Sequence, residues 1–364
     1  MKPRVFALLP LLLFAALLGG CRQAQQVQSQ QGLVMGTLAT ITVYAPRNAA
    51  TDAALQAAFR TLDEINHIWH PWTPDATLAR FNQALHTRQW VPVPADLQPL
   101  LLEALRLSRA SRGNFDPGLG ELTALWGFRE APEPGIERAP PIPSRITALL
   151  RQGIGVKHLQ LRQDPQHGLM ARTDTPTLTL DFGAIAKGYA VDRVVAQLER
   201  AGIENAIVNL GGNLRVLGSK GDSPWRIGIR APRGDGTIAA IRNQGDMSVL
   251  TSGDYERYFI HQGQRFHHIL HPRSGAPARG LISVTVVTDN ATLGDAASTA
   301  LFVAGPRQWP QVARALGVDK VLVVEDSGQV WVTPALQPLL ELAPGVRAQV
   351  RDLSAPRQTK RPAA

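Results

Sequence analysis

Three oxygen-bearing side chains, Asp295, Ser298 and Thr299, lie within one helical turn of each other in the stretch GDAASTALFVAG. Spacings of three and four residues put all three on one face of a helix. Mg²⁺ takes oxygen ligands and is usually held by one or two carboxylates together with substrate phosphates. The stretch therefore predicts a partial magnesium shell of Asp295, Thr299 and one backbone carbonyl. The plain alternative is an aspartate stabilised by a helix dipole, with Thr299 bonded back to its own helix.

A second group of reactive side chains is the histidine cluster in HHILHPRSG, where a strand is predicted over residues 267–270. A neutral imidazole accepts protons well near neutral pH, so His268 is a candidate general base. The alternative is a histidine that only satisfies local hydrogen bonds. A zinc site made by His267, His268 and His271 is disfavoured, because neighbouring residues of a strand point to opposite faces.

A third candidate is the pair Asp181 and Lys187 in LTLDFGAIAKGYAVDRVVAQL, which reads as a strand, a glycine turn and a helix. The glycine spacing excludes a P-loop, and the later run GGNLRVLG does not fit a dinucleotide-binding fingerprint. The two charges could form a plain salt bridge. Alternatively, Asp181 accepts a hydrogen bond from the ring or ribose of a ligand and Lys187 faces an anionic group.

The elements around these residues indicate an α+β fold of mixed sheets with packed helices, because strands and helices do not alternate regularly. A helix capped by Asp52 carries apolar residues at helical spacing, and a second helix is predicted over residues 97–112 and ends at Gly113. A third is predicted over residues 292–303. The predicted strands cover residues 38–45, 206–209, 225–230, 249–252, 283–288 and the hairpin 321–324 with 330–333.

The N-terminus has the order of an export signal: a basic start, an apolar run over residues 6–18, and small residues before Cys21. The ending LGGC resembles the lipobox of bacterial lipoproteins, whose cysteine is acylated after cleavage. We therefore expect a signal peptide over residues 1–20, lipidation at Cys21 and a Gln-rich tether over residues 21–32. One domain is expected over residues 33–350, followed by a basic flexible tail over residues 351–364. The expected location is the periplasmic side of a bacterial membrane.

Charge and cysteine content exclude some classes of protein. Cys21 is the only cysteine, so no disulfide can form within the chain. The formal charge of +9 falls to +7 without Lys2 and Arg4, and it is spread along the chain. A nucleic-acid partner needs a concentrated basic patch, so none is expected. A mild positive field favours an anionic small ligand.

Seven blocks, in this order, resemble the ApbE family of FAD:protein FMN transferases, which are exported magnesium enzymes often made as lipoproteins. They are VMGT, GNFDPGLGEL with LWGF, LDFGAIAKGYAVDRV, VNLGGN, TSGDYERYF, HHILHPRSG and VTVVTDNATLGDAASTALFVAG, covering residues 34–305. The resemblance implies an ApbE-like fold and transfer of FMN from FAD to a Thr or Ser hydroxyl of a target protein, with release of AMP. It also implies an acceptor that is a subunit of a redox chain.

The resemblance assigns roles to individual residues. It implies that Asp181 and Lys187 contact FAD, and that the carbonyl of Ala184 with the oxygens of Asp295 and Thr299 holds Mg²⁺. His268 would help to deprotonate the acceptor hydroxyl, and Asp295 is its catalytic partner through the metal. The remaining contacts implied for FAD are Met35, Trp72, Asn114, Phe115, Asp116 and Ile269. From the bare sequence Trp72 also reads as an ordinary loop residue and Asp116 as a turn carboxylate.

Two positions depart from the family pattern. His271 stands where the family usually has Asp, which questions the network that activates the acceptor; Ser298 stands where some members have a second Asp, which suggests one firm metal site. Two further functions remain open: a magnesium-dependent FAD pyrophosphatase that gives FMN and AMP, and an FAD-binding lipoprotein without catalysis. Asp295→Ala is expected to abolish magnesium-dependent turnover and leave the fold intact.

Overall fold

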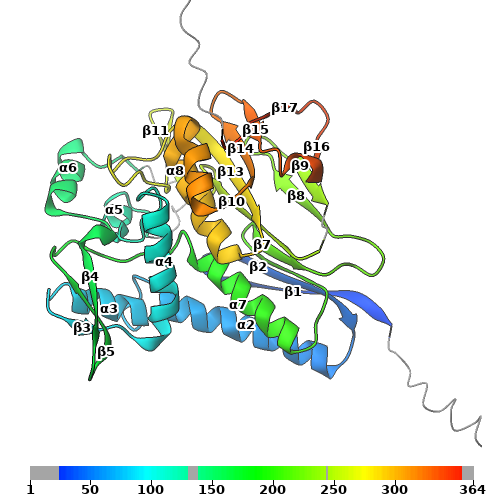
Figure 1. Ribbon diagram of the computed structural model, residues 1–364, viewed down its shortest axis with the longest axis horizontal. Coiled ribbons are helices and arrows are strands. Elements are labelled where there is room, and N and C mark those ends of the chain that lie inside the picture. Colours follow the sequence, from blue (N-terminus) through cyan, green and yellow to red (C-terminus); the bar gives the residue numbers. More distant parts are fainter. Residues whose placement is uncertain (1–23, 130–137, 243–244, 355–364) are drawn as a thin grey trace, which may run out of the picture.

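The computed structural model describes residues 24–129, 138–242 and 245–354 (Figure 1). The expected signal peptide, Cys21 and the end of the expected tail lie outside these residues. Within the described part of the chain, no helix is long and apolar enough to cross a membrane.

A nine-stranded sheet in the order β1-β2-β6-β7-β10-β13-β14-β15-β17 forms the centre of the molecule. All its pairings are antiparallel except that of β15 with β17. Its strands are β1 (Gln25–Val34), β2 (Thr37–Pro46), β6 (Ala206–Leu210), β7 (Asn213–Leu217), β10 (Met247–Gly253), β13 (Leu281–Thr288), β14 (Lys320–Glu325), β15 (Val330–Val332) and β17 (Ala348–Val350). The mixture of sheets and helices confirms the predicted α+β class.

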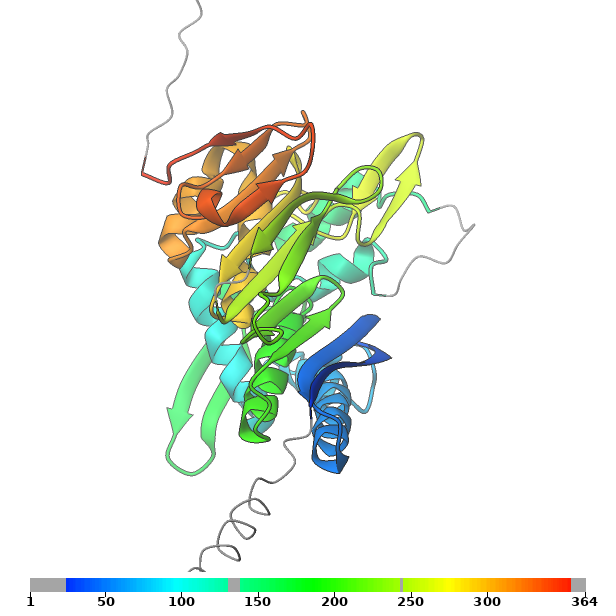
Figure 2. The ribbon, with the colours of Figure 1, turned by 90° about the vertical axis from the view of Figure 1, so that its right-hand side faces the viewer.

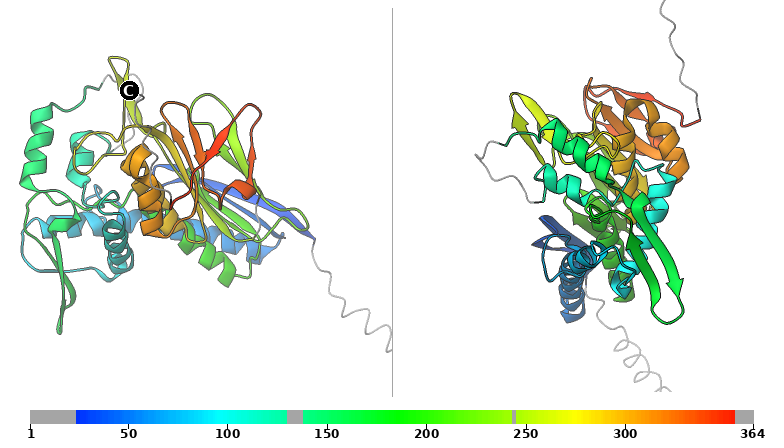
Figure 3. Two further views of the ribbon diagram at one scale, coloured as in Figure 1. Left: turned by 45° about the horizontal axis from the view of Figure 1, so that its top comes forward. Right: turned by 90° about the vertical axis from the view of Figure 1, so that its left-hand side faces the viewer.

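Helices cover one face of this sheet and a small sheet covers part of the other (Figures 1 and 3). The helical layer comprises α2 (Ala49–Trp69), α4 (Gln98–Ala110), α7 (Ala186–Arg200) and α8 (Ala291–Leu316). The three-stranded sheet has the order β16-β9-β8, with β8 (Arg226–Arg230), β9 (Thr237–Arg242) and β16 (Leu340–Leu342). β13 is buried along nearly its whole length because it lies between both layers.

A second lobe packs at one end of the helical layer (Figure 3). It contains the sheet β3-β5-β4, the hairpin β11–β12 and several short helices. The elements of this lobe are α3 (Thr77–Leu85), β3 (Val91–Pro92), η1 (Ala95–Leu97), α5 (Gly120–Leu125), α6 (Pro143–Gln152), η2 (Val156–His158), β4 (Leu159–Asp164), β5 (Gly168–Thr173), β11 (Tyr258–His261) and β12 (Gln264–His267). One more short helix, η3 (Gln337–Leu339), belongs to the main body.

Three sequence expectations about elements were wrong. The Gln-rich segment is no free tether from Gln25 onward, because it pairs with β2 as the edge strand β1. The cap of α2 is Asn48, whose side chain accepts from the Thr51 N–H at 2.9 Å, while Asp52 lies in the first turn. The strand predicted over residues 267–270 ends at His267. The helix predicted over residues 292–303 is confirmed, and α8 continues beyond a kink at Gly305 to Leu316.

Candidate active site at the crossing of two helices

α7 and α8 begin side by side, and each supplies an aspartate that caps the other. Asp295 of α8 accepts a hydrogen bond from the Gly188 N–H of α7 at 2.9 Å. Asp192 of α7 accepts from the N–H groups of Ala291 and Thr292 at 3.1 and 2.8 Å. The first N–H groups of a helix have no partner inside the helix, and its N-terminus carries partial positive charge. Both carboxylates are therefore stabilised by the helix opposite.

The close approach of the helices depends on Gly188. A Cβ atom there would lie 2.2 Å from the Ala291 carbonyl oxygen and 2.8 Å from the Asp295 Cβ. The second oxygen of Asp295 accepts from the Asn213 side-chain amide at 2.7 Å. Asn213 is fixed in turn, because its own oxygen accepts from the Thr251 N–H at 3.2 Å. Asp295 is only 3% exposed, so its position is set entirely by these neighbours.

The carbonyl of Ala184, which lies just before α7, has no hydrogen bond within the described part of the chain. The Gly188 N–H belongs to the first turn of α7, where a helix offers no partner, and it donates to Asp295. The next carbonyl, of Ile185, accepts normally from the Tyr189 N–H at 3.1 Å. The Ala184 carbonyl and the Asp295 carboxylate are both oxygen ligands of the kind that a hard cation takes.

The hydroxyls of Ser298 and Thr299 differ in how many hydrogen bonds the protein makes to them. Thr299 is half-buried and shares a hydrogen bond of 3.0 Å with Ser252. Ser298 is fully buried and is occupied by the Asp295 carbonyl and Ser252, both at 2.9 Å. The back-bond to the helix is thus made by Ser298, and Thr299 has the freer oxygen. The described residues contain no group of three or more His, Cys, Asp or Glu that could hold a metal. The candidate donors around Asp295 are all oxygens, the ligand type that Mg²⁺ takes.

His268 presents one ring nitrogen as a proton acceptor. Its Nδ1 lies 3.2 Å from the Arg257 carbonyl oxygen, which can only accept, so Nδ1 carries the proton and Nε2 keeps its lone pair. The backbone N–H of His268 donates to the same carbonyl at 3.1 Å. Burial, followed by the nearby charges of Arg257, His267 and Lys187, lowers the pKa of His268 well below its usual 6.5. The ring is therefore neutral at neutral pH.

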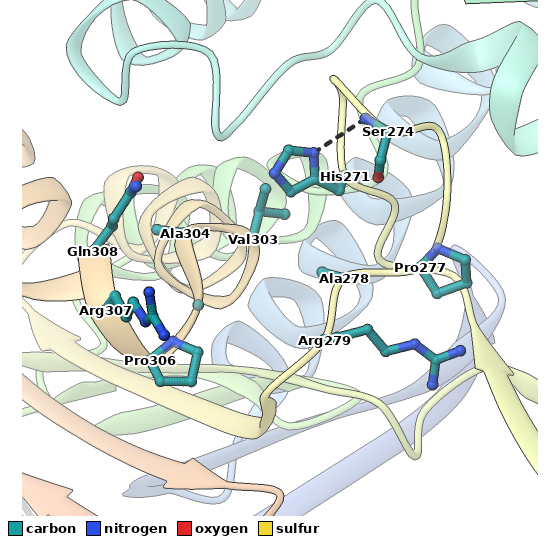
Figure 4. A pocket seen from close by; sticks show the side chains of 11 residues that line it. His271, Ser274, Pro277, Ala278, Arg279, Val303, Ala304, Pro306, Arg307 and Gln308 are labelled. Atoms are coloured by element: carbon teal, nitrogen blue, oxygen red, sulfur yellow. Dashed lines mark hydrogen bonds between the residues drawn. The ribbon is translucent and has the colours of Figure 1, made fainter. Parts of the chain in front are cut away.

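The other two histidines hold the backbone. His267 is buried, with Nε2 2.9 Å from the Ala278 carbonyl oxygen and Nδ1 accepting from the Ile269 N–H. His271 accepts from the N–H groups of Arg273 and Ser274 at 3.2 and 3.4 Å, as Figure 4 shows for Ser274. An aspartate in a turn makes the same kind of bond. These separate tasks leave no shared point for a zinc ion, and His271 takes over a turn-stabilising role that a carboxylate could fill.

His271 also lines a cavity of about 440 Å³ between the loop 271–279 and the kink of α8 (Figure 4). The kink arises where Gly305 adopts φ 70° and ψ −177° before Pro306. This cavity contains none of the oxygens around Asp295, and the Arg279 guanidinium points away from it toward the Arg265 carbonyl. It is therefore not the reaction centre.

Asp181 and Lys187 do not form the salt bridge that was one of the two predictions. Asp181 accepts from the Gly183 N–H at 2.8 Å, and the Lys187 ammonium lies 3.4 Å from the Gly183 carbonyl. Among the described residues, no salt bridge within 4.0 Å involves either side chain. The electrostatic neighbours of Lys187 are instead His268 and Glu256, which places it at the same site as the candidate base.

The predicted strand before Asp181 is wrong as well. Residues 178–181 run without regular structure, because side chains satisfy their backbone. The amide of Asn82 donates to the Leu180 carbonyl and accepts from its N–H, both at 2.9 Å, as a neighbouring strand would. The Asp181 N–H donates to the Pro117 carbonyl at 2.7 Å, which ties this segment to the loop that contains Asp116.

Met35 and Trp72 both lie in tight turns. Met35 has φ 52° and Gly36 φ 69° in the two-residue hairpin turn between β1 and β2, a conformation that favours Asn or Gly. Trp72 follows His70, whose Nδ1 accepts from the Trp72 and Thr73 N–H groups at 3.3 and 3.1 Å. The Arg129 guanidinium lies 4.2 Å above the Trp72 ring and covers one face of the indole in a cation–π contact.

The remaining predicted FAD contacts are built into the fold. Asn114 and Phe115 are buried, and the Asn114 amide donates to the Ser111 carbonyl at 2.7 Å. Asp116 accepts from the Gly118 and Val156 N–H groups at 2.8 and 2.9 Å, as a turn carboxylate does. Burial raises the pKa of Asp116 despite these bonds. Ile269 is 5% exposed and belongs to the main core. Both bonds to Asp116 go to Oδ1, so the surrounding backbone fixes this carboxylate through one of its two oxygens.

Sequence reasoning missed the residues that position the site. Asn213, Gly188 and Asp192 lie within blocks that were noted only as motifs, and no chemical role was predicted for them. Nothing in the local sequence reveals that the Asn213 amide meets Asp295 across 82 positions. The position of Asn213 after two glycines with positive φ was the one available signal of a close approach.

Residues 35–322 match the ApbE family. A Rhodobacter capsulatus protein named FAD:protein FMN transferase is 38% identical over 320 residues, covering 87% of this chain but 59% of that protein. A Vibrio cholerae protein of the same name is 33% identical over 333 residues, covering 89% of this chain and 96% of that protein. The crystal structure of the ApbE protein from Thermotoga maritima has a TM-score of 0.77 at 31% identity and covers 86% of this chain and 99% of its own. The flavin transferase ApbE from Vibrio cholerae has a TM-score of 0.74 at 30% identity, with the same coverage.

Proposed function

The chain belongs to the ApbE family, and we propose that it is an FAD:protein FMN transferase that moves FMN from FAD onto a Thr or Ser hydroxyl of an acceptor protein. The observation that supports this most directly is the fixed carboxylate of Asp295 at the start of α7, where the Gly188 N–H and the Asn213 amide hold it and Lys187 of the same turn lies near His268. Oxygen donors for a hard cation and a histidine with a free Nε2 suit attack on a pyrophosphate.

In the proposed reaction the acceptor hydroxyl attacks the phosphorus of the FMN half of FAD. A new oxygen–phosphorus bond forms, the pyrophosphate bond to the AMP half breaks, and AMP leaves with the electron pair of that bond. His268 Nε2 takes the hydroxyl proton. Lys187 lies close enough to influence the charge of His268, and it would face the anionic phosphates.

Ala184, Asp295 and Thr299 are the residues that would hold magnesium. When bound, Mg²⁺ neutralises charge on the pyrophosphate and on the leaving phosphate. Asp295 keeps free lone pairs for this purpose, because a carboxylate has about four acceptor positions and the protein uses two. Ser298 is occupied by the fold, which supports one site with this donor set.

The low pKa of His268 bears on its role as a base. A neutral imidazole is always available, but burial and the surrounding cations make it a weak proton acceptor. An FAD pyrophosphate in the same site adds negative charge, which raises the pKa of a nearby histidine. Substrate binding would thus strengthen the base that the transfer needs, and the free enzyme would stay unprotonated.

The cell biology of the protein belongs to the same proposal. A signal peptide over residues 1–20 and a lipid on Cys21 would place the enzyme at the periplasmic side of a bacterial membrane. There it would flavinylate a redox-chain subunit. Gln25 already pairs with β2, so only three residues separate the expected lipid from the folded domain. The body of the enzyme would therefore sit close to the membrane.

The direct test uses the purified protein with FAD, Mg²⁺ and a recombinant redox-chain domain that carries flavin on a Thr. Mass spectrometry should find FMN added to the acceptor and AMP released, and both should cease with EDTA. Free FMN in the absence of acceptor would favour the pyrophosphatase. FAD that is bound and recovered intact with acceptor and Mg²⁺ present would favour a binding protein without catalysis.

A further inference from the structure

We propose that the acceptor protein docks on the face of the nine-stranded sheet opposite the helices, in a surface that runs from Leu33 and Leu38 to a pocket beside β8. This inference rests on the proposed transferase function, because it concerns the second substrate of that reaction. We name it the acceptor surface, and its residues are Leu33, Leu38, Asn209, Leu214, Val249, Arg230 and Glu256.

The strand register places these residues next to each other. Thr40 of β2 pairs with Asn209 of β6, Asn209 with Leu214 of β7, and Leu214 with Val249 of β10. Leu38 lies two residues before Thr40, so it points to the same face, and it pairs with Leu33 across the hairpin. The dark blue hairpin and the green strands β6 and β7 form one continuous sheet in Figure 2.

Part of this face is hollow and part is exposed. A pocket of about 320 Å³ has an apolar floor that includes Leu214 and Val249, and its rim carries Arg230 and Glu256. Beyond it, Leu33 is 85% exposed and Leu38 is 49% exposed. Exposed leucines next to a pocket with an apolar floor and charged groups at its rim, linked here through Thr40 and Asn209, are typical of a surface that binds another protein.

β8 offers main-chain partners to an extended segment. It is the outer strand of the sheet β16-β9-β8, so one side of its backbone has no neighbouring strand within the described residues. Residues 227–230 of this strand line the pocket. A peptide in extended form can add to such an edge and place alternate side chains on the apolar floor.

The surface adjoins the reaction centre without sharing its residues. Glu256 on the rim lies near Lys187 and directly precedes Arg257, whose carbonyl holds His268. Thr251, which also lines the pocket, donates its N–H to Asn213, the partner of Asp295. None of the predicted FAD or magnesium ligands lines this pocket. A two-substrate reaction needs a second site beside the first, and this pocket meets that requirement.

A membrane is the other possible partner for exposed leucines in a lipid-anchored protein. Leu33 lies eight residues along β1 from Gln25, a distance of about 27 Å at the usual rise per residue. It is therefore at the end of the strand far from the expected anchor and next to Met35. This position favours the acceptor protein over the bilayer.

The test measures binding separately from transfer. The probe is the recombinant redox-chain domain in two forms, one with its flavin-carrying Thr and one with Val in that place, which can bind but cannot react. The variants are Leu33→Glu, at an exposed position, and Leu214→Phe, on the pocket floor. Leu342→Glu on β16 is the matched control, because Leu342 is a 40% exposed strand leucine at the opposite edge of the small sheet.

We expect Leu33→Glu and Leu214→Phe each to weaken binding of the Val form by about tenfold, with FAD affinity changed less than about twofold. Leu342→Glu should bind like the wild type. Unchanged binding of the Val form by both variants overturns the proposal, as does an equal loss of FAD affinity. Loss of vesicle binding by Leu33→Glu, with acceptor binding intact, would assign the leucines to the membrane instead and likewise overturn it.

The experiment distinguishes failure of the transferase function from failure of the docking surface. If the wild type binds the Val form but transfers no FMN to the Thr form, the transferase function is wrong and the docking surface stands. If the wild type transfers FMN and both variants bind and transfer equally well, the docking surface is wrong and the function stands. If the wild type neither binds nor transfers, both are wrong.

Discussion

Exchanging the carboxylate of Asp295 with the amide of Asn213 tests separately the structural role of Asp295 and its role in holding a metal. Asp295→Asn can still accept from the Gly188 N–H, but its new amide then faces the Asn213 amide, donor against donor. Asn213 cannot rotate freely to relieve this, because its oxygen accepts from the Thr251 N–H. One buried amide is left without an acceptor.

The expected cost follows from these contacts. A buried donor without a partner costs about 1–3 kcal/mol, and loss of the charge at the α7 N-terminus adds about 0.3–1 kcal/mol. For a chain of this size the melting temperature should fall by about 2–8 °C. The double variant Asp295→Asn with Asn213→Asp restores an acceptor for every N–H of the network, so most of the stability should return.

Urea unfolding followed by tryptophan fluorescence measures the stability of the three proteins, and calorimetry measures Mg²⁺ binding in the presence of FAD. We expect the double variant to recover stability without recovering Mg²⁺ affinity, because the carboxylate has moved from α8 to β7. A double variant as unstable as Asp295→Asn, or a single variant as stable as the wild type, would refute the hydrogen-bond network. Full Mg²⁺ affinity in the double variant would refute the metal assignment. The earlier expectation that Asp295→Ala leaves the fold intact is withdrawn, since alanine would orphan both buried donors.

Three further predictions test other parts of the structure. Gly188→Ala should lower the free energy of unfolding by about 3 kcal/mol or more, since its Cβ would lie 2.2 Å from the Ala291 carbonyl oxygen, and urea midpoints check this. Gly202→Ala serves as the comparison for backbone strain without a clash, because Gly202 has φ 79° and nothing lies within 4 Å of the added Cβ, so its loss should be smaller. Burial lowers the pKa of His267 to about 4, so the unfolded protein takes up a proton between pH 6.5 and 4 that the folded protein does not. The free energy of unfolding should therefore fall by about 3 kcal/mol on acidification through that window. His267→Gln should flatten this dependence of stability on pH, and equal slopes in the two proteins would contradict the assignment. Burial also lowers the pKa of His268, so protonation of this histidine should not reduce kcat/KM on acidification to well below pH 6.5. A fall centred at pH 6.5 that His268→Gln abolishes would show that the histidine is not held neutral.

Much of the fold was predictable because its signals are local. The stretch SVTVVT, rich in β-branched residues, marked β13 as a strand, and the apolar spacing after residue 52 marked α2. The hairpin of β14 and β15 followed from Asp326, Ser327 and Gly328 between two apolar strands. Asp295 and Thr299 were predicted to share a helix face because helical geometry alone fixes that relation.

The tertiary structure decided what each of those residues does. Residues 178–181 have the pattern of a strand, but Asn82 occupies the place of a neighbouring strand, which no local rule reveals. The Gln-rich segment lacks a pattern of its own and becomes ordered because β2 offers a free edge. Asp295 acquires its position from Gly188 and Asn213, which are distant in sequence and meet only when α7 crosses α8. Local sequence determines which backbone conformations have low free energy. The hydrogen-bond partner of a buried polar group depends on packing, because every such group must find a donor or acceptor once water is excluded.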